Sequence, residues 1–347
     1  MFHGSYNPED VTFLLQPLTD VRVVTKEEKE KLIAAGEHYS DFIVSESAPS
    51  TEQHVQYIKS LQQHRVALAV GVNSLAFKMV HESNIGDDEI ILISLVRAGT
   101  PLGVLLKRAV ERQTHKDVYH YGVSIIRDRG IDEEALKYIM DKHRNACGIY
   151  FVDGWTGKGT ITRSLRKSLE ESDLWTGPVK LVVFADPAHT ATLSMTDEDL
   201  VLPFGILNST VSGLISRTVY QETGFHGVHY YENLKDYDLT NHFIDAVDTF
   251  AHLLSNSYKS PNTSYHTDTS YVIENIKTLS GVTDDNKIKP SISECTRALL
   301  RRVPREVYVS SLTDPDLQLI LTLCEKENVK VTVYTDISPY KAVAVLV

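Results

Sequence analysis

Short apolar runs alternate along this chain with stretches whose apolar residues recur at helical spacing, and this alternation constrains the fold most. The runs are continuously apolar, which is typical of strands buried on both faces of a parallel sheet. They cover residues 66–72, 89–96, 118–126, 148–152 and 179–185. The helical stretches cover residues 73–83, 101–113, 133–143 and 160–172. This order predicts a doubly wound α/β fold, with helices on both faces of a parallel sheet.

The chain is too long for one hydrophobic core. At 347 residues it exceeds what one core usually supports, so we expect two domains. Residues 236–254 have the pattern of a further helix. Residues 255–271 are rich in Ser, Thr and Asn without apolar periodicity, which is typical of a linker. The sequence therefore predicts a large domain over 1–254 and a small domain over 272–347.

Composition excludes several classes of protein. No apolar stretch is long enough to cross a membrane, and the first residues lack the pattern of a secretory signal. The three cysteines, Cys147, Cys295 and Cys324, have spacings that fit neither a disulfide framework nor a zinc site. A net charge of −11 argues against general nucleic-acid binding but allows a local basic patch. We expect a cytoplasmic protein without a membrane partner.

The strongest chemical signal is the loop YFVDGWTGKGT over 150–160, between an apolar run and a helical stretch. Glycines and a helix N-terminus suit an anion, because backbone N–H groups can approach it closely. The acidic Asp153 stands where a strand tip could bind ribose hydroxyls. The spacing is not that of a Walker loop. The residues expected to cradle a phosphate are Thr156, Gly157, Lys158, Gly159 and Thr160.

A second loop, SLVRAGTP over 94–101, has the same position between a strand and a helix. Arg97 is a natural partner for a diphosphate, since its guanidinium is always charged and bidentate. Ala98, Gly99 and Thr100 follow it, and the first two allow close backbone approach. An ordinary turn with a surface arginine is the alternative for this loop alone. Two such loops at one sheet edge would suit a ligand with two separated phosphates.

The two loops resemble the pyrophosphate and 5′-phosphate loops of type I phosphoribosyltransferases, and the first is closest to the uracil type. The resemblance implies that Asp153 contacts ribose, that Arg97 to Thr100 meet pyrophosphate and its Mg²⁺, and that Thr156 to Thr160 hold the 5′-phosphate. Residues 121–136 occupy the place of the family's flexible flap, where Arg127 or Arg129 could cover the diphosphate. The sequence departs from the family's pattern at Gly154 and Trp155.

Nearly the whole chain is similar to a narrower bacterial family found in tellurium-resistance and stress gene neighbourhoods. The matching segments are 5–18, the two loops, 184–193, 206–219 and the C-terminal module. That family joins a phosphoribosyltransferase-like domain to a Pelota-type RNA-binding domain. It is also known as the cysteine protease StiP family.

The polar segments over 184–219 could face the same crevice. Asp186 and His189 follow a strand end, where a histidine could act as a base or contact a nucleobase; a satisfied loop histidine is the alternative. A polar run inside apolar surroundings is costly to bury without partners, so a ligand-facing role and a capped helix start both remain open. The residues of interest in this run are Asn208, Ser209, Ser212 and Arg217.

The C-terminal module carries a basic stretch, with six basic and two acidic residues over 287–306. Its residues 293–297 resemble the helix start of Pelota and kink-turn-binding ribosomal proteins. The resemblance implies that Glu294 and Arg297 meet RNA, with phosphates on basic neighbours. Those neighbours are Lys289, Arg301 and Arg302. A solvated basic helix face is the alternative.

A thiol protease requires a poised cysteine with a nearby base and a lowered pKa. Cys147 is the one cysteine of the large domain, and its position at the start of an apolar strand favours a buried residue. Cys295 and Cys324 fall on apolar helix faces, as core residues do.

These observations predict an Mg²⁺-dependent phosphoribosyltransferase-like enzyme. It would bind phosphoribosyl pyrophosphate or a nucleotide-like molecule and transfer ribose 5-phosphate to or from a base-like acceptor, with Asp153 and Arg97 as the catalytic pair. The alternatives are a StiP-type cysteine protease and a nucleotide-sensing RNA-binding regulator without catalysis. Structured RNA is an expected partner of the small domain, and a homodimer is left open.

Overall fold

The computed structural model describes residues 2–82, 89–114, 117–143, 148–258, 268–302 and 304–347. Its first part is built on a six-stranded sheet in the order β1-β6-β5-β9-β10-β11, in which every neighbouring pair is parallel. The strands are β1 (Thr12–Phe13), β5 (Ile90–Leu95), β6 (Val118–Val123), β9 (Ile149–Val152), β10 (Leu181–Ala185) and β11 (Leu193–Thr196). The prediction of a parallel α/β sheet is confirmed, whereas the phosphoribosyltransferase type of this sheet is not shown.

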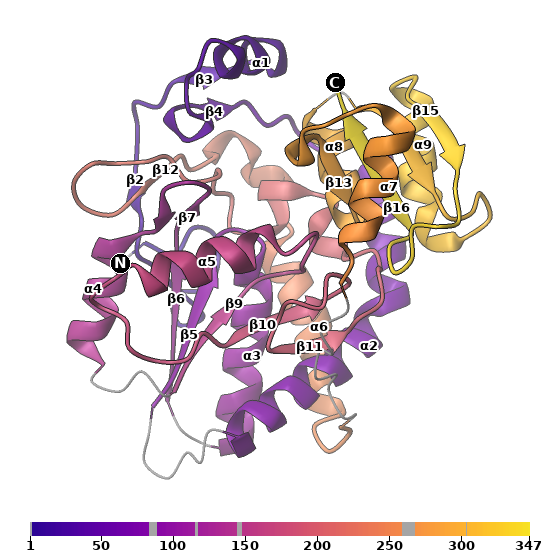
Figure 1. The fold of residues 1–347 in the computed structure, drawn as a ribbon. Helices are drawn as coiled ribbons and strands as arrows, with labels where there is room; N and C mark the ends of the chain where they lie inside the picture. Colours follow the sequence, from indigo (N-terminus) through magenta and orange to yellow (C-terminus); the bar gives the residue numbers. More distant parts are fainter. Residues whose placement is uncertain (1, 83–88, 115–116, 144–147, 259–267, 303) are drawn as a thin grey trace.

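Helices cover both faces of this sheet (Figure 1). One face packs on α2 (Thr51–Glu82), α3 (Gly99–Thr114) and α6 (Thr240–Leu253), and the other on α4 (Glu133–Lys142) and α5 (Thr160–Glu170). Successive strand residues point to opposite faces, so Leu92 of β5 belongs to the first core and Ile93 to the second. Because both faces are buried, the strands are mainly apolar, and Ser94 of β5 and His120 of β6 are buried polar exceptions.

The prediction of a strand over 66–72 is wrong, because these residues lie inside the 32-residue helix α2. The run VALAVGV is continuously apolar, and such runs do not distinguish a buried strand from a buried helix. The buried positions continue at helical spacing, through Leu68, Val72, Leu75 and Met79. Length decides between the two, since the helical pattern extends far beyond an ordinary strand.

Smaller elements surround the carboxyl edge of the sheet. The pairs are β2 (Gln16–Pro17) with β12 (Gly227–Val228), and β3 (Val23–Val24) with β4 (Ile43–Val44). The predicted flap is a short antiparallel hairpin of β7 (Ile125–Ile126) and β8 (Gly130–Ile131). Helix α1 (Lys26–Ala34) begins at a capping box between Thr25 and Glu28.

The C-terminal part forms a second unit around a four-stranded mixed sheet, drawn orange to yellow in Figure 1. The sheet order is β13 (Ile288–Pro290), β16 (Ala342–Leu346), β14 (Pro304–Val309) and β15 (Lys330–Val333). Helices α8 (Ile292–Arg301) and α9 (Gln318–Lys326) pack on one face, and α7 (Ser270–Ser280) packs on the other. The helix–strand–helix–strand order predicted from residue 293 onward is confirmed. The sequence analysis missed α7, β13 and β16.

The apolar core does not stop at the boundary between the two units. The cluster that contains α2, α3 and α6 also contains Ile292 and Leu299 of α8. The second unit is therefore docked on the first by apolar packing as well as by polar contacts. Among the helices of the described residues, none is long and apolar enough to cross a membrane.

Gly99 provides a test of how tightly the segment after β5 packs on the carboxyl end of β9. A Cβ at this position would lie 2.0 Å from the backbone oxygen of Val152 on β9. Because the Val152 oxygen belongs to the backbone of a strand inside the sheet, it cannot move aside easily, and we expect Gly99→Ala to lower the free energy of unfolding by about 3 kcal/mol. Denaturant unfolding measures this change.

Gly205→Ala is the matched control, since its Cβ would meet Trp155 at an ordinary 3.9 Å. It should change the free energy of unfolding by less than about 1 kcal/mol. Equal stability of the two variants would contradict the described packing.

Candidate functional site

The two glycine-containing loops meet at the carboxyl ends of β5 and β9, as predicted for neighbouring strands. A Cβ on Gly154 would lie 3.0 Å from the carbonyl oxygen of Ala98. Asp153 follows β9, and its carboxylate accepts the backbone N–H of Gly154 at 2.7 Å. Burial raises the pKa of Asp153 to about 7, although the Gly154 N–H and the charge of Arg297 act against the rise.

Arg97 is held by groups of the protein itself. Its guanidinium donates to the backbone oxygen of Ile215 at 2.6 Å and to Glu46 at 2.8 Å. Glu46 also accepts the backbone N–H of Ser209 at 3.1 Å. Burial acts to raise the pKa of Glu46, but the charges of Arg97 and Arg301 with these hydrogen bonds lower it to about 2. The carboxylate of Glu46 therefore stands where the sequence analysis placed an anionic ligand of Arg97.

The TGKGT loop contacts the C-terminal unit. Lys158 donates to the backbone oxygens of Asp285 and Ile288, and the hydroxyl of Tyr340 donates to the backbone oxygen of Gly157 at 3.0 Å. Gly159 has φ +71° and precedes α5, which begins at Thr160. The hydroxyl of Thr160 is buried without a partner among the described residues. The loop is thus a docking surface between the two units.

Asp186 and Thr156 hold the loops together. Thr156 donates its hydroxyl to Asp186, which also accepts the backbone N–H groups of Thr190 and Ala191 at 3.0 and 2.9 Å. His189 has φ +52°, and its Nδ1 lies 4.0 Å from a carboxylate oxygen of Asp197. Asp186 therefore stabilises the turn over residues 186–191 that follows β10.

The remaining predicted residues of the first unit make contacts within the protein. Ser212 donates to the backbone oxygen of Asn208 at 2.5 Å. Arg217 donates to the backbone oxygen of Phe42 at 2.6 Å and lies over the Tyr39 ring. Burial lowers the pKa of Arg217 to about 10. Thr100 is buried at the start of α3, and its hydroxyl has no partner among the described residues.

The hairpin β7–β8 reaches toward the C-terminal unit. Arg127 lies 3.3 Å from the side-chain oxygen of Asn286, and its backbone N–H donates to the Tyr39 hydroxyl at 2.7 Å. Arg129 instead pairs with Asp41 at 3.1 Å and lies 4.1 Å above the Tyr220 ring. Of the two alternatives for the flap, Arg127 is the one that lies beside the interface.

The start of α8 faces Trp155. The indole Nε1 donates to Glu294 at 3.3 Å, and the guanidinium of Arg297 lies 5.4 Å from the centre of the same ring. Glu294 and Arg297 are paired at 2.8 Å. Ser291 precedes the helix with φ +82°, a conformation that a glycine adopts easily, and its hydroxyl accepts the N–H of Glu294. Trp155, which departs from the loop pattern, is therefore an interdomain contact.

Arg301 lies at the other end of α8 and donates to the side-chain oxygen of Asn208. Burial lowers the pKa of Arg301 to about 9, and the charges of Arg97 and Arg297 act in the same direction. Burial also lowers the pKa of Lys289 to about 8, with the charges of Arg127, Lys158 and Arg302 adding to the effect. Cations from both units are thus concentrated at one interface. The predicted phosphate loops and the predicted RNA-binding face have become parts of the same contact.

Asp199 links the two units most directly. Its carboxylate accepts the backbone N–H of Ile292, at the N-terminus of α8, at 2.9 Å and that of Lys341 at 2.9 Å. A carboxylate is favourable there because a helix N-terminus carries partial positive charge. Burial raises the pKa of Asp199 to about 7. Neither Asp199 nor Glu46 was found by sequence reasoning, because neither lies in a recognisable motif.

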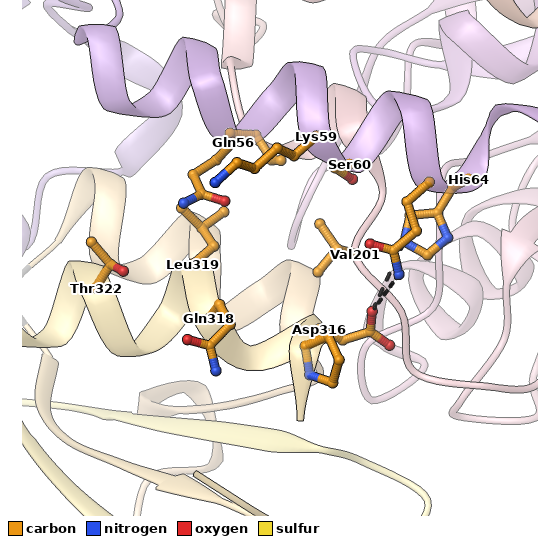
Figure 2. Close-up of a pocket in the computed structure, with 12 residues that line it drawn as sticks. Gln56, Lys59, Ser60, His64, Val201, Asp316, Gln318, Leu319 and Thr322 are labelled. Atoms are coloured by element: carbon orange, nitrogen blue, oxygen red, sulfur yellow. Dashed lines mark hydrogen bonds and ion pairs between the residues drawn. The ribbon is translucent and has the colours of Figure 1, made fainter. Parts of the chain in front are cut away.

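A polar cavity of about 280 Å³ lies between α2 and the C-terminal unit (Figure 2). Gln56, Lys59, Ser60 and His64 of α2 face Leu319 and its neighbours on α9 (Figure 2). The cavity does not include the predicted site residues. No group of three or more metal-ligating His, Cys, Asp or Glu side chains occurs within the described ranges, and the expected Mg²⁺ stays a prediction.

The two described cysteines are poor nucleophiles. Burial raises the pKa of the Cys295 thiol well above its usual range and that of Cys324 to about 11. A reactive cysteine needs the opposite shift. Cys147 lies outside the described residues.

Comparison with known proteins identifies the family. A family model described as "Tellurite-like stress resistance cysteine protease StiP" matches residues 4–248, and one described as "PELOTA RNA binding domain" matches residues 267–347. The chain is also similar to "Cysteine protease StiP" of Acinetobacter baylyi, at 39% identity, covering 99% of this chain and 94% of that protein. The chain belongs to the StiP family. The names of the matching family and of the Acinetobacter baylyi relative both point to an enzyme.

These findings overturn the main functional prediction. The chain was expected to be a phosphoribosyltransferase, but the StiP family and its curated member are named as cysteine proteases. The structure gives a physical reason for the error. Arg97 is paired with Glu46, and the TGKGT loop is packed against Tyr340 and Asp285, so a motif typical of phosphate loops serves contacts within the protein.

The buried carboxyls of Asp153 and Asp199 predict a pH dependence of stability. Their pKa values are about 7 in the folded protein and about 4 when unfolded, so the folded state takes up protons. The stability that this uptake contributes is complete below about pH 4 and is lost as pH rises through about 7. We expect the free energy of unfolding to fall by about 2–3 kcal/mol per carboxyl between pH 5 and pH 9.

Denaturant unfolding across that range measures the effect. Asp199→Asn should flatten the profile, whereas Asp173→Asn, at an exposed acid beyond α5, should leave it unchanged. A profile that keeps its slope in Asp199→Asn would contradict the role of this carboxyl.

Proposed function

We propose that this chain is a stress-response cysteine protease of the StiP type. The observation that carries the proposal is the 39% identity to "Cysteine protease StiP" over 99% of the chain. The family description, "Tellurite-like stress resistance cysteine protease StiP", supports the link to tellurite-like stress.

The chemistry of the cysteines narrows the choice of nucleophile. The sequence has three cysteines, and two of them are buried thiols with raised pKa values. A thiol protease depends on the thiolate, which such surroundings disfavour. By elimination, Cys147 is the proposed nucleophile, and this assignment rests on the sequence.

A histidine that could serve as its base precedes Cys147 by four residues. The Nδ1 of His143 lies 2.7 Å from Glu89, the arrangement in which a carboxylate orients an imidazole. The Nε2 of His143 lies 2.9 Å from the Tyr121 hydroxyl. For His143 to accept a proton from the thiol, Nε2 has to exchange this hydroxyl for the sulfur.

Single cysteine variants test the proposal with fluorescein-labelled casein as the substrate. We expect Cys147→Ala to abolish hydrolysis, and His143→Asn to lower kcat about a hundredfold or more. Cys324→Ala is the matched control, because its thiol is buried with a raised pKa. It should keep the activity while it remains folded, as thermal unfolding can check. Activity that survives Cys147→Ala would overturn the proposal.

RNA binding by the C-terminal unit is a second function, and the match of residues 267–347 to the PELOTA RNA binding domain favours it. We expect a labelled hairpin RNA with a kink-turn to bind in a salt-dependent way, because Lys and Arg side chains release counterions from phosphates. Lys289→Ala and Arg302→Ala should each weaken binding about threefold to tenfold and reduce the salt slope by about one. Lys326→Ala, at the exposed end of α9, is the control. Equal effects of all three substitutions would contradict a site at α8.

A further inference from the structure

The residues expected to meet RNA lie on the face of the C-terminal unit that is docked on the first unit. Glu294 is hydrogen-bonded to Trp155, Arg297 lies over the same ring, and Arg301 donates to Asn208. The contact is close, since a Cβ on Gly157 would lie 3.0 Å from Cγ of Glu294. No nucleotide fits between groups at these distances. In the docked arrangement, the start of α8 is therefore closed to RNA.

Docking brings positive charges of the two units close to one another. Arg301 of α8 is brought near Arg97, while Lys289 of β13 is brought near Lys158 and Arg127. Glu46 and Glu294 are the carboxylates beside these cations that balance part of the charge. Burial and mutual repulsion lower the pKa values of Arg301 and Lys289, which means that their charged forms are disfavoured here. A phosphate backbone would neutralise the same cations of α8 more fully.

Other contacts hold the units together without using the cations of α8. Asp199 accepts backbone N–H groups of Ile292 and Lys341, and Tyr340 donates to the backbone oxygen of Gly157. Apolar residues of α8 share a core with the first unit. The docked state is thus stabilised in part at groups that RNA does not need. At Arg301 and Lys289, which RNA would use, it disfavours the charged form.

From this division we propose that the first unit and RNA compete for the same face of α8, so that RNA binding and docking of the two units exclude each other. The inference rests on the proposed RNA binding and goes beyond it, because it makes the first unit an inhibitor of that binding. Conversely, RNA would uncover the Trp155 and TGKGT side of the first unit.

Trp155 provides the readout, because it is buried at the contact and the chain has one other tryptophan. In full-length protein carrying Trp175→Phe, the emission reports on Trp155 alone. The kink-turn hairpin RNA should shift this emission to the red as the indole becomes exposed to water. The affinity for the same RNA is measured in parallel by fluorescence anisotropy.

Two variants weaken docking without touching the α8 cations. Asp199→Ala removes the carboxylate at the α8 N-terminus, and Tyr340→Phe removes the hydroxyl that binds Gly157 without a change of charge. Both should bind the RNA about tenfold more tightly, because a larger share of molecules is open. Asp173→Ala removes the same side chain at an exposed site and should keep the original affinity.

The outcomes separate the two proposals. Tighter binding by both docking variants, with a red shift of Trp155, supports competition. Weaker binding by both would show that the two units form one RNA site, and unchanged affinity with unchanged emission would show that RNA binds elsewhere; either result overturns the inference. If neither docking variant nor the original protein binds the RNA, RNA binding itself fails, whatever the state of docking.

Discussion

The carboxylate of Asp199 joins the two halves of the molecule at a helix end. It accepts the first N–H of α8 and the N–H of Lys341, so it fixes both the helix and the segment that leads into β16. The contacts that α8 makes with the first unit depend on this placement. Trp155 meets Glu294, and Asn208 meets Arg301, only because the helix start and the helix end are both held against the first unit.

The fold could be predicted where burial on both faces of the sheet requires a continuous apolar run in the sequence. Strands β9 and β10 are apolar throughout, β5 is apolar except for Ser94, and all three were found. The helices between them pack apolar residues on the sheet. Residues 66–72 were placed in a strand because this part of α2 is apolar even at exposed positions such as Val66, so no polar residue marks the helical stripe. The short strands of two residues carry too little sequence to be recognised.

The site was harder to predict than the fold. Topology brings Arg97 and Asp153 to one edge, and this meeting of the loops follows from parallel strands. What the loops contact is decided by distant residues, since Glu46 lies 51 positions before Arg97 and Tyr340 lies 183 after Gly157. A loop suited to an anion is also suited to a carboxylate or a backbone carbonyl of the same protein. The motif could not identify that partner.

The close approach of Gly157 to Glu294 has a consequence for how such proteins diversify. A side chain at position 157 would press on Cγ of Glu294 at 3.0 Å, so the Glu294 side chain would have to shift to admit it. Substitutions at the two positions are therefore coupled, although the positions are 137 apart in the chain. A chimera that exchanges the C-terminal unit between relatives would have to carry the TGKGT loop with it. The segments that must be exchanged together therefore extend beyond the folded C-terminal unit.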